Sequence, residues 1–345
     1  VLLAEELRVN GLWLLGAMRS GKTALATSLG VQLARRNHGP LILVDLKGDD
    51  ETMQTYRWEA DRLGRPFQLF STVPEHPTHL FNVLGQRHLD GLTPSEIAQL
   101  IMLSADLDHG SGHGPSFFRG QSWTGLSEGL VAETGRGWRP SQTRERVQSF
   151  VELSRRLPEV AKARKELKHL EALTVVVNQL CQVATLNGIR GLKWFPEEAM
   201  RESIQIRNLF FPNAEGKYPI VYLYLRAESD PIVAPMIARL FLNLTKNGLR
   251  QFTDARKQGR VQAPPVLVDV IIDEAAYVLD RSLRNLIDQG ASMGFRMILA
   301  NQDISQIAGD DPNFARTLFE NIGNKVLFTC RDATWQDTLM KLSGE

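Results

Sequence analysis

The sequence lacks several features that would restrict its class. It has two cysteines, Cys181 and Cys330, far apart and without metal-ligand spacing, which we interpret as buried apolar residues of a protein from a reducing compartment. The sequence has no run of about 20 apolar residues, so we expect no membrane span within it, and we expect no signal peptide in it. The net charge of +1 excludes a strongly basic DNA-coating protein and an acidic tail. A nucleic-acid partner would therefore have to bind a local patch.

The length of 345 residues permits one large domain or two ordinary ones. The chain begins at Val1 rather than Met and stops abruptly at Glu345. We therefore expect a fragment, with a membrane anchor or tail outside it.

A phosphate-binding loop is the most informative feature that is present. The segment Gly16-Ala17-Met18-Arg19-Ser20-Gly21-Lys22-Thr23 matches G-x-x-x-x-G-K-[ST], after an apolar run and before a helical pattern. The glycines let backbone N–H groups turn toward a phosphate, and the next helix presents its positive end to it. We expect Lys22 to bind the β- and γ-phosphates of ATP and Thr23 to bind Mg²⁺. The alternative is a glycine-rich turn between strand and helix.

Two acidic residues follow a second apolar strand at 268–272. Open α/β sheets bind ligands at the carboxyl ends of their strands, so Asp273 suits a hold on Mg²⁺ and Glu274 a general base for water. The alternative is an acidic helix start. Gln302, after the strand 297–300, is predicted to contact the γ-phosphate and the attacking water; its alternative is a turn amide. A carboxylate beside the metal ligand favours hydrolysis over a kinase reaction.

The hydrophobic pattern predicts an α/β fold. Short apolar runs are typical of buried parallel strands, and helical patterns between them predict helices on both faces of an open sheet. We expect strands at 12–15, 41–44, 67–70, 220–225, 266–272, 297–300 and 325–329. Helical faces are predicted from Ala26, Leu29 and Leu33; from Ile237, Leu240, Phe241 and Leu244; and from Leu279, Leu283, Leu286 and Ile287.

Between about 85 and 212 helical patterns dominate and strand signals disappear, which predicts a helical insertion. Thr93-Pro94-Ser95-Glu96 is a capping box with proline at the first helical position. The Gly/His stretch 109–114 predicts a loop, with a metal site at His109 and His113 as the alternative. Basic residues recur around Trp138, but glutamates alternate with them. We prefer a solvated helix face, with a nucleic-acid or partner surface as the alternative. The basic residues are Arg136, Arg139, Arg144, Arg146, Arg155, Arg156, Lys162, Arg164, Lys165 and Lys168.

The ordered set of motifs resembles the type IV coupling proteins of bacterial conjugation and secretion, within the FtsK/HerA group of RecA-like hexameric motors. In 43–49 the strand ends in Asp-Leu-Lys-Gly-Asp, where the family has Asp-Pro-Lys-Gly-Glu. The other similar segments are the phosphate loop 16–23; 80–84, like the family's Phe-Asn-Pro-Leu; 271–274 with 300–302; and 324–328 with 331–334.

This resemblance implies a RecA-like P-loop NTPase domain formed by 1–85 and 216–345, with an all-α insertion at 86–215. It implies an ATP- and Mg²⁺-dependent motor that is active as a homo-hexamer at the cytoplasmic face of the bacterial inner membrane. Its implied partners are single-stranded DNA or a relaxase–DNA complex and the components of a type IV secretion channel. Two alternatives stay open: another DNA or protein translocase of the group, and a nucleotide-binding scaffold that recruits substrates with little or no hydrolysis.

The resemblance also implies an arginine finger from a neighbouring subunit. In the family it usually lies three residues before the glycine that precedes the sensor strand. Counting back from Gly294 reaches Ala291, a departure that leaves Arg296, Arg284 and Arg281 as candidates.

Overall fold

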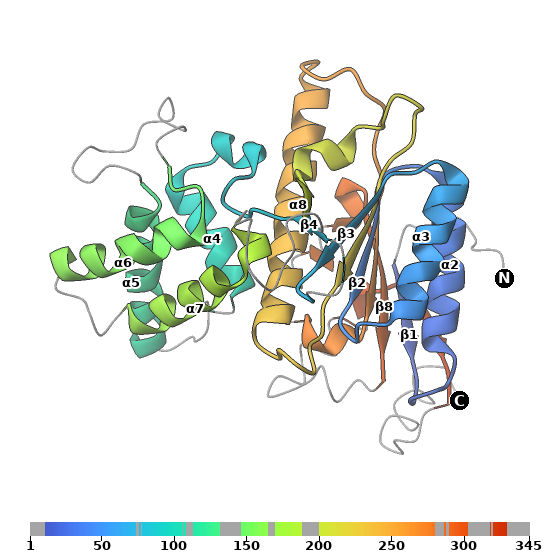
Figure 1. The fold of residues 1–345 in the computed structure, drawn as a ribbon, viewed down its shortest axis with the longest axis horizontal. Coiled ribbons are helices and arrows are strands. Elements are labelled where there is room, and N and C mark those ends of the chain that lie inside the picture. The colour runs from blue at the N-terminus through green and yellow to red at the C-terminus, as the bar shows by residue number, and fades with distance from the viewer. Residues whose placement is uncertain are drawn as a thin grey trace. The chain divides into compact units, whose positions relative to one another are not determined.

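The computed structural model divides into two compact units (Figure 1). Unit 1 comprises Val1–Phe67, Pro212–Pro231 and Pro264–Glu345, and unit 2 comprises Gln68–Phe211 and Ile232–Ala263. The described residues are 11–73, 76, 78–105, 107, 113–131, 146–164, 170–187, 200–279, 286–287, 290–302, 318 and 320–329.

A seven-stranded sheet has the strand order β3-β6-β2-β7-β8-β1-β9. The pairs β6–β2, β2–β7, β7–β8, β8–β1 and β1–β9 are all parallel, which confirms the predicted α/β class with a mostly parallel sheet. The strands are β1 (Leu12–Leu15), β2 (Leu41–Asp45), β3 (Phe67–Ser71), β6 (Ile220–Tyr224), β7 (Val268–Asp273), β8 (Phe295–Asn301) and β9 (Asn324–Leu327).

Two helices cover one face of the sheet in unit 1. Helix α2 (Lys22–Arg36) follows the phosphate loop and packs on β1, β2, β7 and β8, and α3 (Asp50–Leu63) packs on α2 and β6 (Figure 1). The predicted face of α2, formed by Ala26, Leu29 and Leu33, is buried. Of the other predicted helical face in this unit, Leu283 lies outside the described residues. Because parallel strands are covered on both faces, all residues of β2 and β6 are buried, as their apolar sequences require.

The buried Arg65 side chain hydrogen-bonds to the backbone at the end of α2 and just before β2 and β6. The Arg65 guanidinium, 4% exposed, donates to the carbonyl oxygens of Tyr218 (2.7 Å), Ala34 (2.6 Å), Gly39 (2.8 Å) and Pro219 (3.1 Å). Burial lowers the pKa of Arg65 to about 10. The group therefore satisfies buried carbonyls at the end of α2 and before β2 and β6; of these, the Pro219 oxygen also accepts from the Leu41 N–H at 3.2 Å.

Unit 2 is mostly helical. Its helices α4, α5, α6 and α7 pack in sequence order, and α4 also packs on α8. The bounds are α4 (Pro94–Ser104), α5 (His113–Gly129), α6 (Phe150–Arg164), α7 (Glu171–Gln182) and α8 (Val233–Lys257), with short 3₁₀ helices η1 (Arg87–Gly91), η3 (Ala184–Leu186) and η5 (Ile206–Phe210). The predicted face on α8 is buried. This helix comes from the segment assigned by sequence to the nucleotide-binding domain, and the predicted domain boundaries stay a prediction.

Unit 2 contains one helix start that the sequence predicted and one short strand that it did not predict. The capping box at Thr93 and Glu96 is present, which confirms that predicted helix start. A short strand β5 (Met200–Ser203), which has no apolar alternation, pairs in parallel with β4 (Thr78–Leu80). The sequence pattern missed β5 because this strand depends on its distant partner rather than on its own residues.

Some of the basic residues and cysteines named in the sequence analysis are buried or half-buried in the structure, and others lie outside the described residues. Arg146 is buried, and its guanidinium donates to the Leu84 and Gln86 carbonyls and pairs with Asp90 at 3.0 Å, so it is not part of a solvated face. The segments 132–145 and 165–169, with Trp138 and the other basic residues there, and most of the Gly/His stretch lie outside. Cys330 also lies outside, while Cys181 is half-buried with a free thiol.

Within the described ranges, no helix combines the length and hydropathy that a membrane span requires.

Candidate functional site

The phosphate loop connects β1 to α2 with the backbone geometry that its glycines were predicted to supply. Gly16 has φ +156°, and a Cβ there would lie 2.5 Å from the Phe328 Cβ. Gly21 has φ +99° and caps the amino end of α2. Arg19 also adopts a left-handed conformation, with φ +59°. A side chain at Gly16 would clash with Phe328, whereas a side chain at Gly21 would have space but would strain the backbone at its positive φ.

Lys22 is buried beside this loop, and Ser20 is half-buried with its hydroxyl oxygen shielded from solvent. The Lys22 Nζ donates to the carbonyl oxygens of Gly16 (2.5 Å) and Ala17 (2.9 Å). Burial is the largest influence on the pKa of Lys22 and lowers it, against the opposing charge of Glu274. Among the described residues, the buried Ser20 Oγ has no hydrogen-bond partner. The loop thus contains a buried cation and an unsatisfied hydroxyl, both suited to an anionic ligand.

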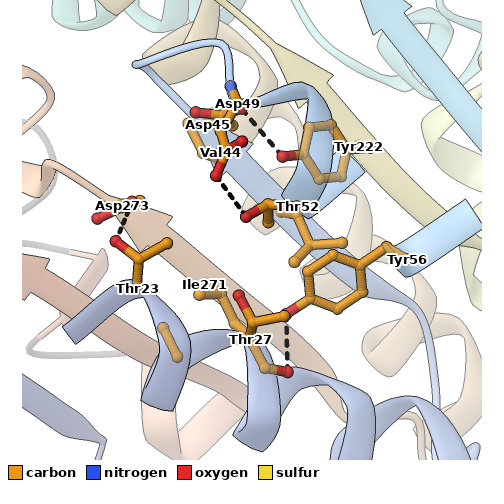
Figure 2. A pocket seen from close by; sticks show the side chains of 12 residues that line it. Thr23, Thr27, Val44, Asp45, Asp49, Thr52, Tyr56, Tyr222, Ile271 and Asp273 are labelled. Atoms are coloured by element: carbon orange, nitrogen blue, oxygen red, sulfur yellow. Dashed lines mark hydrogen bonds between the residues drawn. The ribbon is translucent and has the colours of Figure 1, made fainter. Parts of the chain in front are cut away.

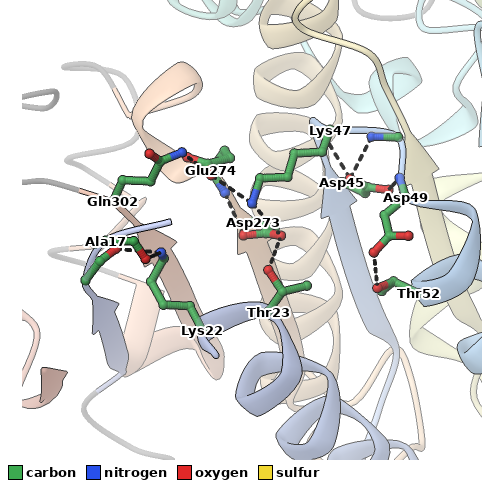
Figure 3. Close-up of polar contacts among 12 residues, drawn as sticks. Ala17, Lys22, Thr23, Asp45, Lys47, Asp49, Thr52, Asp273, Glu274 and Gln302 are labelled. Atoms are coloured by element: carbon green, nitrogen blue, oxygen red, sulfur yellow. Dashed lines mark hydrogen bonds and ion pairs between the residues drawn. The ribbon is translucent and has the colours of Figure 1, made fainter. Parts of the chain in front are cut away.

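The loop and the distant acidic pair meet at the carboxyl edge of the sheet. Thr23 Oγ1 donates to Asp273 Oδ2 at 3.0 Å, although the two residues are 250 positions apart (Figure 3). The parallel order β2-β7-β8-β1 brings these strand ends to one edge, as the sequence analysis predicted from strand-end carboxylates.

Glu274 is held in a restricted conformation beside Asp273. Its backbone is left-handed (φ +56°, ψ +51°), and its N–H donates to Asp273 Oδ1 at 3.0 Å. The buried Oε1 accepts hydrogen bonds from Gln302 Nε2 (2.8 Å) and from Lys47 Nζ (2.8 Å) (Figure 3). A left-handed non-glycine residue is disfavoured by roughly 1–3 kcal/mol, so surrounding contacts must maintain it. The structure therefore brings Glu274 and Gln302 together.

Lys47 is the site residue that sequence reasoning missed. Its Nζ also lies 3.3 Å from Asp273 Oδ2. Burial alone would lower the pKa of Lys47, but the Asp273 and Glu274 carboxylates outweigh it and raise the pKa above its ordinary value. The available signal was its place in the Asp-Leu-Lys-Gly-Asp segment at the end of β2, the strand next to β7, a segment to which the sequence assigned no site role.

Asp45 shapes the loop that carries Lys47. Its buried carboxylate accepts from the N–H groups of Lys47 (3.0 Å), Gly48 (2.9 Å) and Asp49 (2.7 Å) and from the Tyr222 hydroxyl (2.9 Å). Burial raises the pKa of Asp45, although these donors stabilise its charged form. The loop is thereby fixed with Lys47 facing the β7 end.

A small cavity of about 30 Å³ adjoins the Thr23–Asp273 contact (Figure 2). Its polar lining includes Thr27, Asp49 and Tyr56. This volume suits one or two water molecules rather than a nucleotide. The cavity beside the predicted metal position is therefore too small to be the nucleotide site.

Two further residues named in the sequence analysis, Met18 and Arg296, have different surroundings in the structure. Met18, in the middle of the phosphate loop, is exposed. The buried Arg296 guanidinium pairs with Asp269 at 2.6 Å within unit 1. That ion pair gives Arg296 a role inside its own subunit, and Arg281 and Arg284 lie outside the described residues. In the part of the chain that the structure describes, no group of three His, Cys, Asp or Glu could hold a metal ion.

Residues 267–345 match a family model described as the TraM recognition site of TraD and TraG. The resemblance to the type IV coupling proteins is confirmed. Comparison with curated proteins gives no significant match.

Solved structures extend this resemblance over most of the chain at the level of the fold. The plasmid coupling protein TrwB in complex with ADP and Mg²⁺ has a TM-score of 0.64 at 14% identity, covering 94% of this chain and 72% of TrwB. The unbound monoclinic form of TrwBdeltaN70 gives 0.64 at 14%, covering 98% and 73%. VirB4 of Thermoanaerobacter pseudethanolicus gives 0.57 at 12%, covering 97% and 80%. This chain therefore shares the fold of these proteins.

Proposed function

We propose that this chain is the motor part of a conjugative coupling protein that hydrolyses ATP with Mg²⁺. The observation that carries the proposal is the 3.0 Å contact between Thr23 Oγ1 and Asp273 Oδ2, with Glu274 directly beside it. A phosphate loop, a metal-binding pair and a carboxylate for water then form one site. We assign the nucleotide-binding domain to 1–85 and 216–345 and the helical insertion to 86–215.

The donor set fits magnesium and a nucleotide. Hydroxyl and carboxylate oxygens are the ligands that Mg²⁺ prefers, and Thr23 and Asp273 supply one of each. The backbone of 16–21, the Ser20 hydroxyl and Lys22 would hold the phosphates. TrwB structures contain ADP with Mg²⁺ and the ATP analogue ADPNP, which supports the same ligands here. Thr23 and Asp273 would hold Mg²⁺, which would offset the negative charge of the phosphates.

The side chains of the site would divide the work of hydrolysis. Lys22 exchanges its two carbonyl partners for oxygens of the β- and γ-phosphates. Glu274 orients the attacking water and accepts its proton, and Gln302 links the γ-phosphate to Glu274. Lys47 holds the Glu274 carboxylate at 2.8 Å and thereby positions it.

The motor would assemble and act in conjugation. We propose a homo-hexamer at the cytoplasmic face of the bacterial inner membrane, anchored by a segment outside this sequence. Its cargo is single-stranded DNA or a relaxase–DNA complex, delivered to a type IV secretion channel. The family described for 267–345 supports a contact between this segment and a TraM-type accessory protein.

Steady-state ATP hydrolysis by a Lys22→Ala variant tests the site. Hydrolysis should be abolished while the circular dichroism spectrum and cooperative unfolding remain, because the lysine acts on the phosphates. Lys217→Ala is a matched control in the same unit, since Lys217 has no ion-pair partner among the described residues. Equal turnover of Lys22→Ala and the wild type would refute the proposed site.

The likeness to VirB4 favours a second candidate, another translocase of the same group. Stimulation of hydrolysis by single strands supports the conjugative motor, whereas preference for duplex DNA or no stimulation by DNA supports the other translocase. A scaffold without hydrolysis would show no turnover at any protein concentration, but a ring motor shows turnover that rises with assembly.

A further inference from the structure

A second cavity lies within unit 2, with a volume of about 220 Å³. It is formed where η1, η5 and the end of α8 meet. Its lining residues are Arg87, His88, Gly91, Arg207, Phe210, Phe211, Gly248, Gln251, Phe252, Ala255 and Val261. None of these is part of the proposed hydrolytic site.

The charge of the cavity has one sign. Arg87 and Arg207 are exposed on its wall, and neither guanidinium has an ion-pair partner among the described residues. None of the described residues that line it is acidic. An anionic group would therefore bind here without displacing an internal ion pair.

Three aromatic rings form another part of the wall. The Phe252 ring lies 5.7 Å from the Phe210 ring and, edge-on, 5.4 Å from the Phe211 ring. Phe211 is one of the large apolar side chains that remain exposed. Aromatic rings of this kind can stack on a nucleobase whatever its identity, because every base has a π-face.

The cavity also contains a polar side chain that lacks partners. His88 is 6% exposed, and neither ring nitrogen has a hydrogen-bond partner among the described residues. Burial and the nearby Arg146 lower the pKa of His88 to about 4, so the imidazole is neutral near pH 7. Both ring nitrogens are closed to solvent and diverge around the ring, so His88 gives the cavity a neutral polar wall rather than a paired contact to one base edge.

We propose that this cavity binds one base of a single-stranded nucleic acid, with the adjoining phosphates on Arg87 and Arg207. The volume is below the 300–1,000 Å³ of typical pockets for drug-sized ligands, which favours a single ring system over a whole dinucleotide. Exposed guanidinium groups at the wall suit a backbone that runs outside. The inference rests on the proposed nucleic-acid cargo but not on ATP hydrolysis.

The test is fluorescence anisotropy with a labelled oligodeoxythymidylate of about 12 nucleotides, within the site sizes of single-strand binders. The Arg87→Ala/Arg207→Ala double variant should bind about tenfold or more weakly, and its salt slope should fall by about 1.4, or about 0.7 for each lost phosphate contact. Phe211→Ala should bind at least about fivefold more weakly, since stacking is lost. Gly91→Leu should also weaken binding, because Gly91 lines the cavity and a larger side chain has open space at this position.

Arg250→Ala is the matched control, since it removes an exposed arginine of α8 that does not line the cavity. Repeating each measurement in a Lys22→Ala background separates this site from hydrolysis. Displacement of the labelled oligonucleotide by free dTMP, added at an equal concentration of nucleotide units, would support the base site and identify a mononucleotide as its ligand. Equal binding by all variants and the control, or equal competition by polyglutamate, would overturn the proposal.

Discussion

Lys47 gives a direct test of how the acidic pair is used. Its Nζ lies 2.8 Å from Glu274 Oε1 and 3.3 Å from Asp273 Oδ2. A Lys47→Met substitution retains most of the side-chain volume and removes the charge, so both ion pairs are lost with little change in packing. Because Glu274 adopts a disfavoured backbone conformation, loss of this contact should release its carboxylate from the position that it needs for water.

The size of the effect follows from the geometry. At the 2.8 Å separation, the attraction is about 1.5 kcal/mol at the dielectric constant of water and about 6 kcal/mol at an effective value of about 20. The Lys47 side chain is 38% exposed, so solvent screening keeps the attraction near the lower limit. About 1.5–2.5 kcal/mol remains, which corresponds to a decrease of roughly 10- to 70-fold in kcat.

Steady-state kinetics with saturating MgATP would measure kcat, and calorimetry would measure ADP affinity. We expect kcat to fall and ADP affinity to stay near the wild-type value, since Lys47 contacts the carboxylates rather than the phosphate loop. Lys47→Arg should recover part of the rate, and Lys217→Met should behave as the wild type. An unchanged kcat in Lys47→Met, or an equal loss of ADP affinity, would refute the positioning role.

Three further predictions concern the loop, the fold and pH. Gly16→Val should abolish ADP binding measured by calorimetry, because its side chain would meet Phe328; normal affinity would contradict the proposed cradle. Arg65→Ala should lower the free energy of unfolding in urea by about 3–5 kcal/mol, since it leaves buried carbonyls unpaired; a change within error would refute this. Because the folded-state pKa of Asp45 is raised, its contribution to stability is fully present below its ordinary pKa of 3.8 and is lost as pH rises through the folded value. The free energy of unfolding of the wild type, minus that of Asp45→Asn, should therefore decline as pH rises above 3.8. A difference that does not change with pH would contradict the sign of this pKa shift.

The sequence by itself determined the parts of the site whose chemistry is local. The loop 16–23 specifies its own turn, because glycines at fixed spacing permit backbone conformations that other residues disfavour. The apolar runs identified the central strands, since a strand buried on both faces needs apolar residues throughout. The capping box at Thr93 and Glu96 likewise contains its own hydrogen-bond partners.

Only the tertiary structure decided which distant residues act together. The sequence predicted a role for Glu274 but no contact between it and Lys47, and the two residues meet because β2 and β7 pair in parallel with Asp45 opposite Asp273. Arg146 shows the opposite case, since a residue from a basic stretch is buried against backbone carbonyls. Composition and spacing describe neighbours along the chain, whereas ion pairs and burial depend on the register and packing of segments far apart in it.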